Sequence, residues 1–168
     1  MFEFATADGT IVPSGSVITK SDVEDHTDPE DGEDNMQIPT GLWIKPVKTE
    51  LNGEKLCVKL RVDVEKIDHG SISFCLLGNC VPAMREGTYE SNGGFVDKLD
   101  DLQTEWMIGN DEETYKAKYG EATAKLTLVV CRKVSNGKDQ FGIEHFKYED
   151  VGESSTVTVK FVYNEKST

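Results

Sequence analysis

The stretch Leu56-Cys57-Val58-Lys59-Leu60-Arg61-Val62-Asp63-Val64 decides the fold class. Its even positions are apolar and its odd positions are mostly polar, which is the period-two pattern of a β-strand with one buried face. The same pattern returns in Ile72–Leu76, Leu126–Val130 and Val157–Tyr163. A shorter candidate, Thr40–Val47, contains Pro46, which suits a strand end or a sheet edge. Strands therefore dominate the expected structure.

Three Asn-Gly pairs punctuate the chain, and this dipeptide suits tight hairpin turns that need positive φ. They are Asn52–Gly53, Asn92–Gly93 and Asn136–Gly137. We expect the first to join a strand around Trp43 to the Leu56 strand, and the third to join the Leu126 strand to one near residues 141–148. Only Glu112–Lys118 suggests a helical turn. The pattern predicts an all-β, antiparallel β-sandwich that occupies residues 1–168 as a single domain.

Size and charge exclude several function classes. The 168 residues are enough for one domain with a real core, and no apolar run approaches the roughly 20 residues that a membrane helix needs. The formal net charge of -13 repels nucleic acid and anionic membrane surfaces. We therefore expect a partner other than nucleic acid and a chain that does not span a membrane.

Residues 22–39 form a segment that we expect to be a long acidic loop or an ordered excursion between strands. Eight carboxylates without a Lys or Arg gather there: Asp22, Glu24, Asp25, Asp28, Glu30, Asp31, Glu33 and Asp34. An EF-hand is excluded, because placing Gly32 at loop position 6 puts Thr27 and Pro29 where oxygen ligands are needed. A different calcium site, with help from Asp97, Asp100 or Asp101, is the alternative to a solvated loop.

The four cysteines are Cys57, Cys75, Cys80 and Cys131. Strand parity points Cys57, Cys75 and Cys131 away from the core face, and free thiols usually prefer burial, so we expect bonded sulfurs. Of the three possible pairings we favour Cys75–Cys80 with Cys57–Cys131. Chain-entropy arguments give about 2 kcal/mol for the short link and about 4.5 kcal/mol for the long one. Free thiols remain an alternative, as does zinc, which would need ligands closer in sequence.

Candidate binding residues are aromatic. Trp43, Tyr89 and Trp106 are our candidates for a sugar-stacking or protein-binding surface, with Tyr115 and Tyr119 as further aromatics. Most large aromatics in a β-sandwich belong to the core, which is the competing interpretation. Catalytic signatures are missing: the three histidines match no metalloprotease pattern, and no nucleophile elbow, phosphate loop or dinucleotide fingerprint occurs.

A Cys-x4-Cys turn stands in Ser71-Ile72-Ser73-Phe74-Cys75-Leu76-Leu77-Gly78-Asn79-Cys80, and Gly87-Thr88-Tyr89, Leu102-Gln103-Thr104-Glu105-Trp106 and Tyr119-Gly120 follow it. Together these motifs resemble a group of uncharacterised exported proteins of Bacteroidetes. Phe2-Glu3-Phe4 through Asp8-Gly9-Thr10 is similar to their mature N-terminus. The resemblance implies an immunoglobulin-like β-sandwich and export after removal of a signal peptide. It implies no activity and no catalytic residues.

The sequence thus predicts a non-catalytic extracytoplasmic module, whether secreted, periplasmic or at the cell surface. We expect it to bind a protein or a glycan, or to serve as a structural component, without a cofactor. One alternative is a calcium-dependent adhesive domain that uses Asp22–Asp34. An enzyme is the other alternative.

Overall fold

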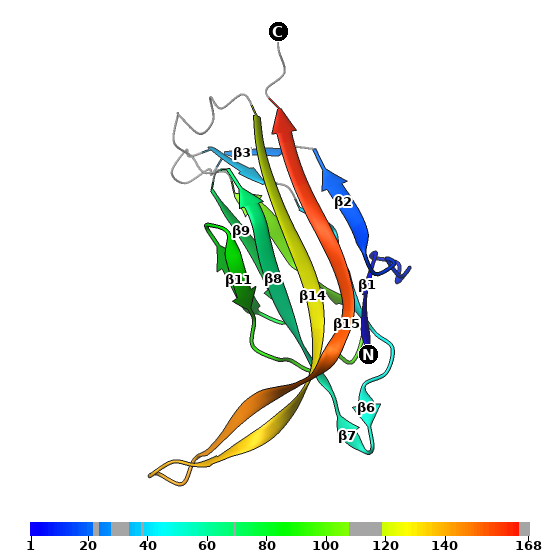
Figure 1. Cartoon of the computed structure of the whole chain (residues 1–168), viewed down its shortest axis with the longest axis vertical. Helices are drawn as coiled ribbons and strands as arrows, with labels where there is room; N and C mark the ends of the chain where they lie inside the picture. Colours follow the sequence, from blue (N-terminus) through cyan, green and yellow to red (C-terminus); the bar gives the residue numbers. More distant parts are fainter. Residues whose placement is uncertain (22–23, 28–33, 38, 69, 108–118, 165–168) are drawn as a thin grey trace.

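The computed structural model describes residues 1–21, 24–27, 34–37, 39–68, 70–107 and 119–164 (Figure 1). Strands account for the regular structure of these residues, and no helix occurs among them. The strands are β1 (Phe2–Ala5), β2 (Ser16–Lys20), β3 (Glu24–Thr27), β4 (Asp34–Gln37), β5 (Trp43–Pro46), β6 (Glu50–Leu51), β7 (Glu54–Lys55), β8 (Cys57–Ile67), β9 (Ser71–Leu76), β10 (Asn79–Ala83), β11 (Gly87–Glu90), β12 (Asp100–Asp101), β13 (Gln103–Met107), β14 (Tyr119–Lys138) and β15 (Glu144–Asn164). The predicted all-β class is confirmed.

The largest sheet has five strands in the order β11-β8-β14-β15-β2. Strand β14 lies in its middle and pairs antiparallel with β8 on one side and β15 on the other. The edge strand β2 pairs parallel with β15, so the expectation of a purely antiparallel sheet is wrong. Parallel neighbours need a long connection, and here most of the chain separates the two strands.

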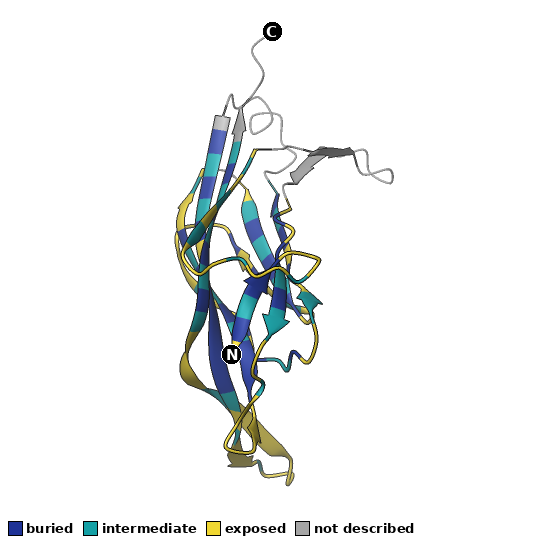
Figure 2. Cartoon of the chain, turned by 90° about the vertical axis from the view of Figure 1, so that its right-hand side faces the viewer, coloured by how far each residue is buried: buried dark blue, intermediate teal, exposed yellow. Residues whose placement is uncertain are grey.

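Two three-stranded sheets, β1-β5-β12 and β10-β9-β13, form the opposite layer. They adjoin where β12 runs into β13, and Leu102 between these strands donates its N–H to the carbonyl of Leu42. Trp106 of β13 packs against Phe161 of β15, with ring centroids 6.0 Å apart, so the layers share one core. Figure 2 shows buried residues along the facing strands of both layers.

The sequence located the strands better than the turns. Asn52 and Gly53 do adopt positive φ, but they close the separate small hairpin β6–β7 rather than joining two long strands directly. Asn136–Gly137 is not the hairpin turn that we expected: β14 continues past it to Lys138, and the pair coincides with a register shift. A second two-residue turn lies at Leu77–Gly78, where both residues also have positive φ.

The acidic segment contains a hairpin instead of being a loop throughout. Strands β3 and β4 pair antiparallel from Glu24 opposite Gln37 to Thr27 opposite Asp34. The carboxylates of residues 22–23 and 28–33 lie outside the described residues, as does the expected helical turn Glu112–Lys118. The calcium hypothesis therefore stays a prediction.

Candidate functional site

Strands β14 and β15 extend well beyond the two-layered body and form a projecting two-stranded ribbon, coloured yellow to orange in Figure 1. Strand β14 pairs with β8 only as far as Cys131, whereas it pairs with β15 as far as Lys138 opposite Glu144. We call residues 132–153 the arm. Within the described part of the chain no third strand pairs with the outer edges of the arm. These edges therefore offer unpaired backbone groups.

One face of the arm is held by ion pairs. Arg132 lies 3.1 Å from Glu149 across the ribbon and 3.3 Å from Glu54 of β7. Lys147 reaches the other oxygen of Glu149 at 3.6 Å. These side chains are partly exposed, so each pair contributes at most about 1 kcal/mol. Their role is to tie the base of the arm to the β6–β7 hairpin.

The other face is aromatic. The ammonium group of Lys133 lies 4.4 Å from the ring centroid of Phe146, a cation–π contact. Tyr148 lies directly over Gly93, so closely that a Cβ added to that glycine would stand 2.4 Å from the ring. Gly93 thus has a structural role that differs from the hairpin turn expected for Asn92–Gly93. It lets the tyrosine ring rest against the body at the base of the arm.

The tip of the arm is organised by one carboxylate, that of Asp139. Its Oδ1 accepts the N–H groups of Phe141 and Ile143 at 2.8 and 3.1 Å, and its Oδ2 lies 2.8 Å from Nε2 of His145. The backbone N–H of Asp139 donates to the Ile143 carbonyl, and Gly142 supplies positive φ. The hydrogen bond with His145, followed by those from Ile143 and Phe141, lowers the pKa of Asp139. The tip is consequently a built turn.

This built turn presents large apolar side chains to solvent. Phe141 is 78% exposed and Ile143 is 60% exposed, while Phe146 and Val151 add further exposed apolar surface along the arm. Exposed apolar residues are common when scattered singly, but several together on a projecting element mark interaction sites. Sequence reasoning missed this tip. The available signal was Phe141-Gly142-Ile143 beyond the Asn-Gly pair, an apolar cluster without strand alternation.

At the root of the arm, Cys57 and Cys131 stand directly opposite each other on β8 and β14. Both are fully buried and their sulfurs are 3.0 Å apart, but they are not bonded in this structure. The prediction that they point to an exposed outer face is wrong, although the parity itself holds. Strand β14 is central, so long side chains from both neighbours, among them Lys59 bound to Asp150 at 2.7 Å, cover its outer face.

The predicted Cys75–Cys80 link is present, with an S–S distance of 2.03 Å. The two residues face each other on β9 and β10, and Cys75 lies off the core face as expected, since its neighbours Phe74 and Leu76 are buried. The other two cysteines, Cys57 and Cys131, are free in the described structure.

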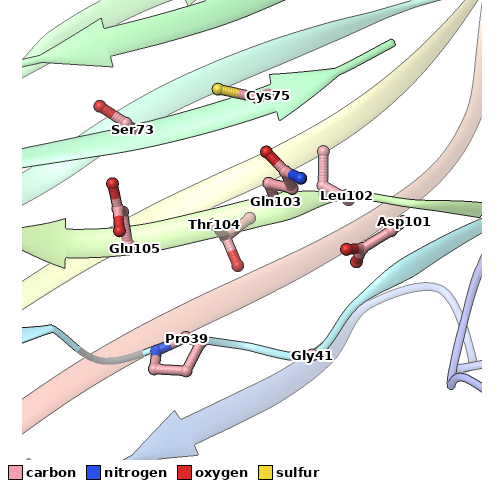
Figure 3. Close-up of a pocket in the computed structure, with 9 residues that line it drawn as sticks. All are labelled: Pro39, Gly41, Ser73, Cys75, Asp101, Leu102, Gln103, Thr104 and Glu105. Carbon is pink, nitrogen blue, oxygen red and sulfur yellow. The ribbon is translucent and has the colours of Figure 1, made fainter. Parts of the chain in front are cut away.

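A second candidate surface is an open groove of about 400 Å³ beside the disulfide (Figure 3). Strand β13, strand β9 and the segment before β5 form it, and Glu105 faces Ser73 across paired strands. The lining residues are Pro39, Gly41, Ser73, Cys75, Asp101, Leu102, Gln103, Thr104 and Glu105. The serine has no histidine beside it within this set, so the groove offers polar contacts without a nucleophile–base pair.

The three aromatic candidates do not form one surface. Trp43, Tyr89 and Trp106 belong to three different sheets. Trp106 is fully buried against Phe161 and is a core residue, so its assignment to a binding surface is wrong. Tyr89 is half-buried against the core, and its hydroxyl donates to the Arg85 carbonyl at 3.2 Å.

Within the described ranges, no cluster of three or more His, Cys, Asp or Glu side chains has the geometry to hold a metal ion. Asp97 is engaged by Lys55 at 2.9 Å. The described residues contain no helix that is long and apolar enough to cross a membrane.

Known proteins offer no guide to this arrangement. No protein-family model matches the chain, and neither a curated protein nor a solved structure is similar to it.

Proposed function

We propose that this chain is a non-catalytic, extracytoplasmic docking module that binds a protein partner through the tip of the arm. The observation that carries the proposal is the ordered turn at Asp139, which holds Phe141 and Ile143 exposed. Two large apolar side chains on a preorganised turn suit insertion into an apolar pocket, because little conformational entropy is lost on binding. The partner is accordingly a protein with such a pocket.

The open edges of the arm support a protein rather than a lipid or glycan partner. A strand from the partner can pair with the unpaired backbone of β14 or β15, which adds directional hydrogen bonds to the apolar contact. The net charge of -13 opposes approach to an anionic membrane. A glycan platform would need exposed aromatic faces over polar groups, and the groove lining contains no aromatic residue.

Extracytoplasmic placement and an immunoglobulin-like arrangement are parts of the same proposal. The Cys75–Cys80 bridge supports the first, because a partly exposed disulfide persists in oxidising compartments. The two-layered, all-β body supports the second in a general way.

The test begins with a photo-crosslinking amino acid at position 141 and, as a control, at position 84. Met84 is 76% exposed but lies in the body, so it matches Phe141 in exposure and apolar character. We expect position 141 to capture a defined protein on native cells, and position 84 not to capture it.

The captured protein is then purified and titrated against the wild-type chain and single variants. Phe141→Ser and Ile143→Ser should each weaken binding by about 10- to 30-fold, as expected for apolar anchors, and Met84→Ser should leave binding unchanged. Equal effects of all three substitutions would overturn the proposal. Co-sedimentation with phosphatidylcholine vesicles that depends on Phe141 would instead assign the tip to a membrane.

The calcium-dependent adhesive domain is tested separately by melting curves with and without millimolar calcium. A site built from the carboxylates of residues 22–34 would bind the folded state and raise its melting temperature. An unchanged melting temperature would eliminate that alternative.

A further inference from the structure

The Cys57–Cys131 pair has a geometry that the docking proposal does not use. Directly opposed residues of an antiparallel pair have Cα atoms about 4.5–5.5 Å apart, inside the range of about 4.4–6.8 Å that disulfides span. The two sulfurs are already 3.0 Å apart, and each cysteine is the partner of the other in the β8–β14 register. Bond formation therefore needs only a small movement of the two side chains, and the backbone hydrogen bonds between the strands can stay in place.

The Cys75–Cys80 pair can be compared with the Cys57–Cys131 pair. Cys75 and Cys80 are also directly opposed on antiparallel strands, and they are bonded. The two cysteine rungs thus share their register relation and differ in their bonding and burial.

We propose that Cys57 and Cys131 form a second disulfide bond, which joins β8 to β14 at the root of the arm. The rung is the last one of the β8–β14 ladder, and beyond it β14 continues as the arm. The bond would replace a contact between two thiols by a covalent tie at the point where the arm leaves the body. This inference stands independently of what the arm binds.

The reaction is thiol–disulfide exchange with an external low-molecular-weight disulfide. The Cys57 thiolate attacks one sulfur of the external disulfide and releases the first small thiol. Cys131 then loses its proton and attacks the sulfur of Cys57, which releases the second small thiol. One S–S bond is broken and one is formed, and two electrons and two protons pass from the cysteine pair to the external disulfide.

The hydrogen bonds of the pair are consistent with this order. The Cys57 sulfur lies 3.1 Å from the Cys131 carbonyl oxygen, to which it can donate while protonated. The hydrogen bond from the Cys131 thiol lowers the pKa of Cys57, against the effect of burial. The same hydrogen bond, and then burial, raises the pKa of Cys131. Cys57 is therefore the first sulfur to become a thiolate.

Metal binding is a weaker role for the same pair. A closed structural zinc site takes four ligands, and no third metal-binding side chain joins the two sulfurs among the residues that the structure describes.

The test exposes the purified chain to oxidised glutathione, then alkylates the remaining thiols and maps the peptides by mass spectrometry. Reaction is slow in the folded protein because both sulfurs are buried, so a second sample is refolded from urea in the same glutathione buffer. We expect a peptide pair linked through Cys57 and Cys131 and no alkylation at either residue. The unfolding equilibrium constant should fall on the order of a thousandfold, since the bond closes a loop between residues 74 positions apart.

Cys57→Ser is the control, and it should abolish the stabilisation by oxidant while leaving Cys75–Cys80 bonded. If the buried hydroxyl prevents folding, Cys57→Ala serves instead. The proposal would be overturned if both thiols stayed open to alkylation after oxidative refolding. A glutathione adduct left on either cysteine would overturn it as well, because the partner sulfur would have failed to displace it.

Discussion

The β9–β10 hairpin and the β14–β15 hairpin show two ways of holding a pair of antiparallel strands. The short one turns within two residues, Leu77 and Gly78, and a covalent bond closes it one rung away. The long one ends in a wider turn held by the carboxylate of Asp139, and beyond Cys131 no third strand pairs with it among the described residues. The first hairpin is fixed inside a sheet, whereas the second remains ordered although it projects into solvent.

The two hairpins are suited to different tasks. An isolated two-stranded ribbon is only marginally stable in water, so the arm depends on its root contacts and on its tip network. A hairpin that serves only the core has no need for exposed side chains such as Phe141. The predictions below separate these contributions by weakening each hairpin where it is held.

Removing the covalent tie should have the largest effect on stability. The double substitution Cys75→Ser/Cys80→Ser opens a loop between residues that are 5 apart in sequence and should lower the free energy of unfolding by about 2 kcal/mol. Urea denaturation measures the change. Hydrogen exchange in the arm should be unaltered, and faster exchange there would show that the two hairpins are not independent.

Crowding the root of the arm should have the next largest effect. Gly93→Ala places a Cβ 2.4 Å from the Tyr148 ring, which must tilt away, and we expect a loss of about 1 kcal/mol. The matched control is Gly152→Ala on β15, where an added Cβ meets nothing within 4 Å. Thermal unfolding compares the two variants. Equal melting temperatures would mean that Tyr148 does not support the arm.

Loosening the tip should be a local effect. Asp139→Ala removes the acceptor of the Phe141 and Ile143 N–H groups, so these amides should exchange faster with solvent while the body stays protected. Asp97→Ala, which removes an exposed partner of Lys55, is the control. Protection of residues 141 and 143 that survives Asp139→Ala would contradict the assigned role of this carboxylate.

The same tip should respond to acid. The folded tip lowers the pKa of Asp139 below its ordinary 3.8, so the contribution of the carboxylate is complete above pH 3.8 and is lost as the pH falls through the lowered value. Amide chemical shifts of Ile143 followed from pH 6 to pH 2 test this. A tip that is already disordered at pH 5 would contradict it.

The smallest effect is expected from the ion pairs that cover β8. Arg61, and then Lys59, lowers the pKa of Glu90, but this carboxylate is partly exposed. Glu90→Gln should therefore cost less than about 1 kcal/mol at neutral pH. The difference from wild type should shrink as the pH falls below the ordinary pKa of 4.5 and disappear only below the lowered pKa, where the folded carboxylate also loses its charge. Urea denaturation at pH 7 and pH 3 compares the two proteins.

Alternation alone was enough to predict the buried middle of each long strand, because burial of one face follows directly from period two. For Cys131 the alternation predicted correctly that the side chain points away from the core, but it predicted wrongly that the side chain is exposed. Alternation cannot tell a central strand from an edge strand. The hairpin turn was misplaced for a related reason. An Asn-Gly pair suits a bulge as well as a turn, and only the pairing of the distant β15 strand selects between them.

The candidate site was beyond sequence reasoning because it depends on length. Nothing local shows that β14 runs past the end of β8, and the exposure of Phe141 follows from that overhang. Trp106 shows the converse: an aromatic residue offered as a binding candidate is buried by a strand far along the chain.

The way that β1 and β2 lie against β15 has a consequence for biosynthesis. The N–H of Phe2 donates to Ser154 at 2.8 Å, 152 positions away, and β2 completes the edge of the large sheet against residues 157–161. Strand β2 has no partner strand until β15 has been synthesised, whereas β1 pairs with the earlier strand β5. The nascent chain therefore cannot complete its fold on the ribosome strand by strand.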